Sequence, residues 1–127
     1  MQEQLSKVAK FHRVFKQKDG VEPQLLSKND FLLRHKLMAE ENEEYLEACE
    51  QDDMVEIADA LGDQLYILCG TILKHGMQNI IEDVFNEIQE SNMSKLDENG
   101  EPLFREDGKI MKSKLYFPPN ISKILNK

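Results

Sequence analysis

The sequence predicts an all-α protein, an antiparallel helix bundle of about four main helices followed by an irregular C-terminal tail. Apolar residues recur at spacings of three and four through most of the first 93 residues. Capping residues and glycines separate these segments, and turn signals gather after Met93. Because 127 residues suit one hydrophobic core, we expect a single domain over residues 1–127, with a helical core of about 1–93 and a tail of 94–127.

The first two helices follow from apolar spacing and from the residues that flank them. Residues 2–18 should form one amphipathic helix that ends at the Asp19-Gly20 turn. Its inward side chains are expected to be Leu5, Val8, Phe11 or His12, and Phe15. A second helix should begin near the SKND stretch, where Asn29 or Asp30 would cap its first turn, and run to about Glu50.

Aspartates and a glycine delimit the third helix. Asp52 or Asp53 should cap a helix that runs from about Met54 to His75 and stops at Gly76, where glycine permits the left-handed conformation. A fourth helix should cover about residues 79–92. Its inward side chains are expected to be Ile80, Ile81, Val84, Phe85 and Ile88.

The tail carries the turn signals Asn-Gly and Asp-Gly and two prolines. Residues 104–110 can form a small β-hairpin around Asp107-Gly108. The pattern also allows a short terminal helix near residues 121–125. We expect this tail to pack onto the helices.

Composition limits the expected partners. The net charge of -8 repels nucleic-acid backbones and anionic lipid, so we expect neither nucleic acid nor a membrane as a partner. Cys49 and Cys69 lack C-x-x-C spacing, so we expect free thiols in a reducing cytoplasm, and no signal peptide is visible. The second and third helices alone would expose much apolar surface, so we expect a homodimer or a dimer of dimers.

Carboxylates gather on the inward stripes of the second and third helices. On the second helix, Glu41 and Glu44 share a stripe of about 60° of arc with Leu37 and Ala48. The third helix places three acids at i, i+3 and i+7: Glu56, Asp59 and Asp63. Antiparallel packing would bring the two stripes together, and neither carries a lysine. A hard divalent cation, Mg²⁺ or Mn²⁺, would balance these charges and would in turn hold a phosphate-bearing substrate.

Most of these acids also have an ordinary structural explanation. An E-E-x-x-E run can be a solvated helix face, and Glu40 can pair with Lys36 one turn earlier. Glu56 can complete a capping-box-like pair with the N-cap aspartate, and Asp59 can be favoured by the helix dipole. Asp63 has no such explanation, since it lies mid-helix among apolar residues.

The stretch LRHKLMAEENEEYLEA followed by EIADALGDQLYILCG resembles the MazG-like, all-α nucleoside triphosphate pyrophosphohydrolases. Their signature is E-E-x-x-E, a spacer and then E-x-x-D. The tail SNMSKLDENGEPLFREDGKIMKSKLYFPP looks like the short phage and bacterial branch, so the resemblance covers about residues 11–119. It implies Mg²⁺-dependent hydrolysis of a nucleoside triphosphate substrate between the α and β phosphates, and it also points to a homo-oligomer.

The resemblance assigns roles to the first motif. Glu41 and Glu44 would be Mg²⁺ ligands, and Glu40 would orient or activate water, so Glu40 and Glu41 are the catalytic candidates. A carboxylate outside the metal's ligand shell can take a proton from the attacking water.

The second motif departs from the family pattern. Its aspartate falls on Asp63, but the position three residues earlier, which should be glutamate, is Ala60. Either Asp59 replaces the missing ligand, or Glu56-x-x-Asp59 is itself the motif and Asp63 is added.

Basic and aromatic side chains should contact the substrate. The candidates are Arg34, Asn92, Lys95, Lys114 and Tyr116, with Arg105, Lys112 and Phe117 as further possibilities in the tail. Structural explanations exist for some of them: a surface ion pair for Arg34, a helix C-terminal cation for Lys95 and an anchor of the tail for Tyr116. The alternative function is a non-catalytic dimerisation or adaptor module whose acidic faces are simply solvated.

Overall fold

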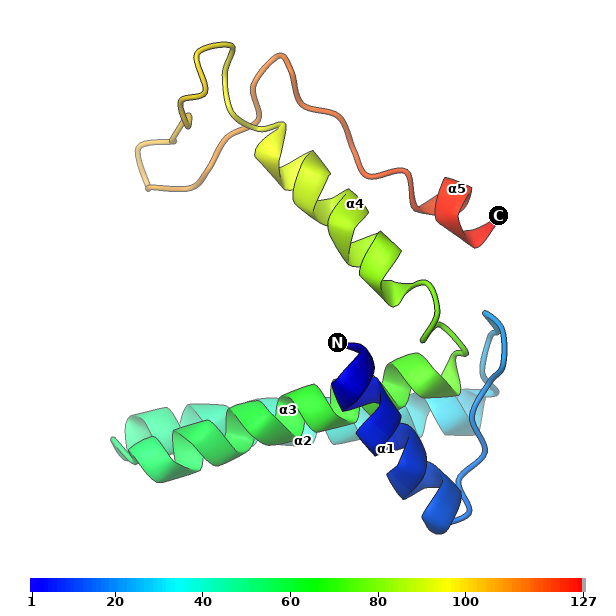
Figure 1. Ribbon diagram of the computed structural model, residues 1–127. Helices are drawn as coiled ribbons and strands as arrows, with labels where there is room; N and C mark the ends of the chain where they lie inside the picture. Colours follow the sequence, from blue (N-terminus) through cyan, green and yellow to red (C-terminus); the bar gives the residue numbers. More distant parts are fainter. Residues whose placement is uncertain (127) are drawn as a thin grey trace. The chain divides into compact units, whose positions relative to one another are not determined.

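The computed structural model of this chain describes residues 1–126, which form five α-helices, four of them substantial (Figure 1). The predicted all-α class is therefore confirmed. The chain divides into two compact units, Met1–Asn79 and the part from Ile80 onward, and each is described by itself. The fourth helix is thus grouped with the tail and not with the first three helices, and the single domain stays a prediction. No helix of the described residues is long and apolar enough to cross a membrane.

Helix α1 (Gln2–Val14) is shorter than predicted and turns a different side inward. Leu5, Val8 and His12 are its buried residues, whereas Phe11 and Phe15 are 42% and 61% exposed. The predicted inward position of Phe15 is wrong because the helix ends before it. The chain leaves the helical path at Lys16, which has a φ of 60°.

Helices α2 (Lys28–Glu50) and α3 (Met54–Lys74) begin at side-chain caps. Ser27 caps α2 by accepting a hydrogen bond from the Asp30 backbone amide at 3.3 Å, so the predicted caps Asn29 and Asp30 lie two and three residues too late. Both lie inside the first turn, where an aspartate is favoured by the helix dipole. Asp53 caps α3 as one of the two predicted alternatives, accepting from the Glu56 amide at 3.1 Å.

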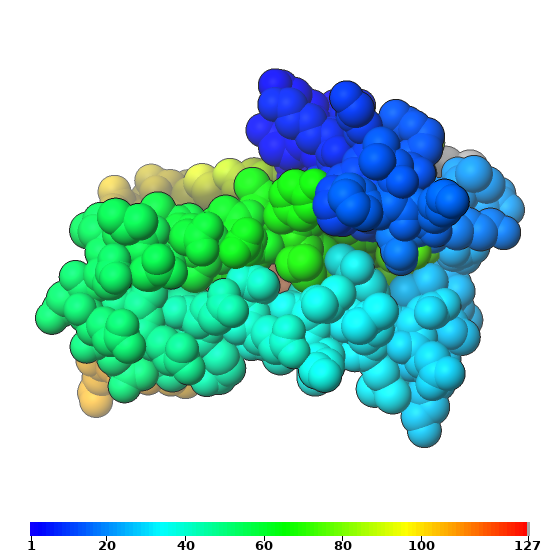
Figure 2. Space-filling view, turned by 90° about the horizontal axis from the view of Figure 1, so that it is seen from below, coloured from blue at the N-terminus to red at the C-terminus, as the bar shows by residue number. Residues whose placement is uncertain are grey.

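The helices α2 and α3 lie side by side as an antiparallel pair, and α1 lies over α3 (Figures 1 and 2). Ala48 and Ala60 are 4% and 2% exposed, and such small side chains let two helices approach closely. The rest of the buried apolar core of this unit is Leu5, Val8, Cys69, Ile72 and Leu73. Cys49 and Cys69 are free thiols, as predicted.

The loop after α1 covers the end of α3. The Gly20 amide donates to the Leu73 carbonyl at 3.0 Å, and the Gln24 amide donates to the His75 carbonyl at 2.9 Å, which satisfies carbonyls that a helix end leaves free. Gly76 follows with a φ of 67°, so the predicted left-handed stop is confirmed.

The second unit contains α4 (Ile81–Met93) and α5 (Ile121–Leu125). Ile81 and Val84 are partly covered, but Phe85 and Ile88 are 65% and 41% exposed, so their predicted inward position is wrong. The tail runs along a different face of α4, where the buried Ser91 hydroxyl donates to the Phe117 carbonyl at 2.8 Å.

The remaining predictions about the tail are confirmed in outline. The expected hairpin is reduced to one antiparallel bridge between Phe104 and Ile110, closed over a turn in which the Gly108 amide donates to the Arg105 carbonyl at 2.9 Å. The terminal helix α5 forms as expected, with Asn120 as its cap.

Candidate metal centre and active site

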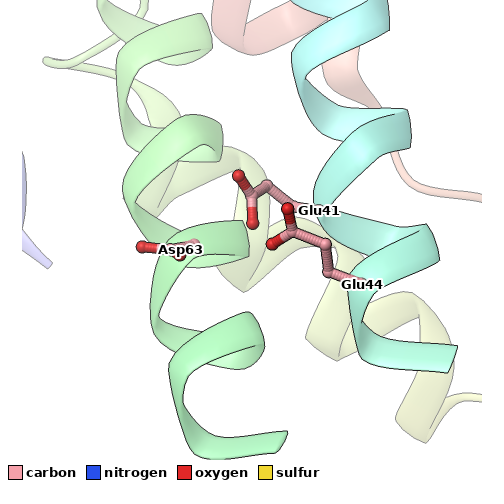
Figure 3. A group of neighbouring side chains, drawn as sticks. All are labelled: Glu41, Glu44 and Asp63. Atoms are coloured by element: carbon pink, nitrogen blue, oxygen red, sulfur yellow. The ribbon is translucent and has the colours of Figure 1, made fainter. Parts of the chain in front are cut away.

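Three carboxylates from α2 and α3 lie together in the middle of the helix pair. One oxygen each of Glu41, Glu44 and Asp63 lies within 4.8 Å of the other two. Figure 3 shows the side chains of Glu41 and Glu44 extending from α2 toward α3, the helix that carries Asp63. The two helix stripes predicted to converge therefore do meet at these residues.

Helix periodicity and close packing produce this cluster. Glu41 and Glu44 are three residues apart and so occupy neighbouring positions on one face of α2. Asp63 follows the buried Ala60 by three residues and so lies near the face of α3 that packs on α2. With alanines at the contact, the two backbones come close enough for side chains of this length to meet.

The local electrostatics are unfavourable for three ionised carboxylates. Burial raises the pKa of Glu41 above its ordinary value, and the neighbouring Glu44 carboxyl and the charges of Asp63 and Asp59 raise it further. Burial also raises the pKa of Asp63, and the negative charges of Asp59 and Glu44 raise it further. The Oε2 atom of Glu41 is buried and has no hydrogen-bond partner among residues 1–126.

A divalent cation fits this group of residues. A buried carboxylate oxygen without a partner is costly, and a cation removes that cost together with the mutual repulsion. Carboxylate oxygens are the ligands that Mg²⁺ and Mn²⁺ prefer. The cluster therefore has the chemistry of a divalent-metal site.

The other acids predicted from the motifs lie around the cluster. Asp59 is exposed and one turn before Asp63, and its charge acts on both Asp63 and Glu41. Glu56 is exposed in the first turn of α3, and its backbone amide takes part in the cap. Glu40 is exposed on α2 beside Glu41.

The predicted substrate contacts fall into both units. Arg34 is 9% exposed and is hydrogen-bonded to α3, so it is not in a surface ion pair. The other four candidates, Asn92, Lys95, Lys114 and Tyr116, lie in the second unit. Tyr116 is half-buried beneath the Lys112 ammonium, which lies 4.6 Å from the ring centroid. Their roles as substrate contacts stay predictions.

Sequence reasoning missed one buried polar pair. His12 Nδ1 and Asp19 Oδ1 are 2.6 Å apart, and His12 is 5% exposed. His12 shares a helical stripe with Leu5 and Val8, which predicts burial but not a partner. The partner comes from the loop after α1, whose path the sequence does not define.

The sequence matches the family described as phosphoribosyl-ATP pyrophosphohydrolase over residues 8–92, a span that includes all three clustered carboxylates. No curated protein matches the chain. The matched family has the all-α fold of the MazG-like nucleoside triphosphate pyrophosphohydrolases, so the similarity seen in the motifs is confirmed. The chain therefore belongs to the phosphoribosyl-ATP pyrophosphohydrolase family and is a pyrophosphohydrolase of nucleotide-like substrates.

Proposed function

We propose that the protein hydrolyses a nucleoside triphosphate between its α and β phosphates in a Mg²⁺-dependent reaction, releasing a nucleoside monophosphate and pyrophosphate. The observation that carries this proposal is the cluster of Glu41, Glu44 and Asp63 with its unpartnered Glu41 oxygen. A non-catalytic adaptor would need no such crowding, because acids on a solvated surface can separate.

Each acid near the cluster has a role in this proposal. Glu41, Glu44 and Asp63 would hold the cation. Asp59, whose charge acts on Asp63, would be a further ligand. When bound, the cation neutralises phosphate oxygens and orients the reacting phosphorus. Glu40 remains outside the cluster and exposed, so it is free to accept a proton from the attacking water.

Side chains of the second unit are proposed to contact the outer phosphates. Lys95 and Lys114 supply positive charge, and Asn92 supplies an amide that can donate to a phosphate oxygen. Tyr116 offers a ring for stacking.

We further propose that the protein is a homodimer or a dimer of dimers. Leu61, Leu65 and Leu68 on α3 are 50%, 45% and 46% exposed, as is Leu46 on α2 at 50%. Exposed leucines at this spacing form an apolar helix face that a second copy would cover. Sedimentation of the wild type and of Leu65→Glu tests this, and a monomeric wild type would refute it.

The activity is tested by a pyrophosphate-release screen over the nucleoside triphosphates, with phosphoribosyl-ATP added because the family carries its name. The screen is run with Mg²⁺ and with EDTA. Glu44→Gln and Asp63→Asn should abolish release, whereas Glu43→Gln, an exposed neighbour outside the cluster, should retain it. Equal release by the wild type and both cluster variants would remove the catalytic assignment.

A further inference from the structure

A cavity of about 360 Å³ lies next to the carboxylate cluster within the first unit. Leu37 lines it one helical turn before Glu41. Arg34, another lining residue, precedes Glu41 by two turns, a rise of about 10 Å along the helix. That distance is comparable to the length of a nucleoside, so a nucleotide whose phosphates meet the cluster can place its base here.

One wall of the cavity consists of aromatic rings. The Phe11 and Phe15 ring centroids are 4.5 Å apart, and Tyr66 meets Phe11 edge-on at 5.7 Å and 84°. All three rings line the cavity, and they are 42%, 61% and 40% exposed. Open aromatic faces of this kind are suited to stacking on a planar base, whatever its identity.

Three polar side chains line the cavity, His12, Gln17 and Arg34, and the guanidinium of Arg34 is held in a fixed position. Arg34 Nε donates to Thr71 Oγ1 at 3.0 Å, and Nη2 donates to the Ile67 carbonyl at 2.9 Å. The remaining nitrogen, Nη1, has no partner among residues 1–126 and is not completely buried. Two of the five guanidinium N–H donors are thus used, and the pair on Nη1 of this nine-tenths-buried arginine is left for a ligand, together with the second N–H of Nη2.

Neighbouring residues hold this guanidinium in place and keep it charged. A Cβ atom at Gly70 would lie 2.6 Å from Arg34 Nη2 and 3.2 Å from His12 Nε2, so guanidinium and imidazole both pack against the bare glycine. His12 is itself fixed by Asp19. Burial lowers the pKa of Arg34 and the Asp19 charge raises it, and an arginine remains protonated under such conditions.

We propose that Arg34 is a specificity-determining residue that binds an exocyclic carbonyl oxygen of the substrate base, so that adenine nucleotides are disfavoured. This inference rests on the proposed function, and it makes the base the part of the substrate that Arg34 contacts. Because the Arg34 guanidinium is nearly buried, it can contact only an atom that projects from the ring of the base. Guanine, hypoxanthine, uracil, thymine and cytosine offer a projecting carbonyl, whereas adenine offers an amino group, which cannot accept from a cation.

The test compares inosine and adenosine nucleotides, because the two purines differ only at C6 and N1: hypoxanthine has a carbonyl beside an N1–H donor, and adenine has an amino group beside an unprotonated N1. For the wild type, kcat/KM for ITP should exceed that for ATP by about tenfold or more, since an amino group would leave a charged donor unpaired. The Kd values of IMP and AMP in EDTA should show the same order. This second measurement needs neither metal nor catalysis, so it decides the inference even if no pyrophosphate is released.

Variants separate recognition from a structural role. Arg34→Met should bring the ITP to ATP ratio of kcat/KM close to one, mainly by lowering the value for ITP. Arg13→Met, a matched change at an exposed position of α1 outside the cavity lining, should leave the ratio unchanged. Phe11→Leu should weaken binding of both nucleotides equally, because stacking does not distinguish them.

The outcomes discriminate clearly. A wild type that treats ITP and ATP alike in both measurements overturns the inference, as does an unchanged ratio in a folded Arg34→Met. If Arg34→Met fails to fold, the wild-type comparison of IMP with AMP still decides. If no triphosphate is hydrolysed but IMP binds more tightly than AMP, the proposed reaction fails while the assignment of Arg34 survives.

Discussion

Replacing Glu41 by glutamine removes one of the three clustered negative charges and keeps the shape of the side chain. In the metal-free protein this change should be stabilising, which is unusual for a half-buried residue. The reason is that Glu41 is repelled by both Glu44 and Asp63 in the folded state, and these groups separate on unfolding.

The magnitude follows from the geometry. The carboxylate oxygens lie within 4.8 Å of one another. At such a separation two like charges repel by about 0.9 kcal/mol in water and by about 3.5 kcal/mol at an effective dielectric constant of about 20. Glu44 is exposed, so its repulsion lies near the lower value. With about 0.9 kcal/mol for Glu44 and about 0.9–3.5 kcal/mol for the less exposed Asp63, we expect Glu41→Gln to raise the free energy of unfolding in EDTA by about 2–4 kcal/mol.

A divalent ion should reduce this advantage of Glu41→Gln over the wild type. A ligand that binds only the folded protein adds about 2.7 kcal/mol when its concentration is about one hundred times Kd. The wild type should gain this amount from Mg²⁺, whereas Glu41→Gln has lost a ligand and should gain much less. Relative to the wild type, the same mutation is therefore clearly stabilising without the metal and much less stabilising with it.

Urea unfolding followed by circular dichroism, in EDTA and in excess MgCl₂ at a fixed protein concentration, measures both effects. Glu43→Gln is the matched control, because it removes an exposed glutamate of the same helix that lies outside the cluster. The reasoning is refuted if Glu41→Gln destabilises the protein in EDTA, or if it gains as much from Mg²⁺ as the wild type does.

Three further predictions concern pH and glycine. Because the pKa values of Glu41 and Asp63 are raised above 4.5 and 3.8, the folded state binds protons more tightly. The advantage of Glu41→Gln in EDTA should therefore shrink as pH falls through the raised pKa values, and urea titrations at several pH values measure this. Gly76→Ala should cost at least about 1–2 kcal/mol, as judged from thermal unfolding. Its φ is 67°, and a Cβ would lie 2.1 Å from the Glu22 carbonyl oxygen. Gly62→Ala meets nothing within 4 Å in α3, so the same measurement should show a gain of up to about 1 kcal/mol.

Periodicity was sufficient to predict the helices, but it misplaced part of the buried faces of α1 and α4, where Phe15, Phe85 and Ile88 are exposed. Asp53 and Gly76 delimit α3 as predicted, because caps and left-handed stops are local chemistry. The end of α1 and the cap of α2 were placed wrongly by a few residues. There, Lys16 and Ser27 take their conformations from the loop that returns to the end of α3, and such a path depends on tertiary packing.

Glu41, Glu44 and Asp63 were all predicted as metal ligands, but the sequence left open how Asp59 and Glu56 belong with them. Two alternatives remained open because Ala60 stands where the motif has glutamate. The residue that lies with Glu41 and Glu44 is Asp63, while the charge of Asp59 acts on Glu41 and Asp63 from one turn away. A helical wheel gives the angle of each side chain but not the height at which two helices face each other, so the sequence could not decide between these acids.

That height is fixed by contacts outside the cluster. Arg34 reaches the Ile67 carbonyl on one side of Glu41, and the Gln64 amide donates to the Asn42 side-chain oxygen at 3.1 Å beside it. Sliding α3 by one turn would break both contacts. Since carboxylate repulsion alone would drive the helices apart, these hydrogen bonds and the close packing at the alanines must hold the acids in place before any ion arrives. The site is therefore preorganised by neighbours that need not contact the metal, and the register of α2 against α3 is the structural property on which its chemistry depends.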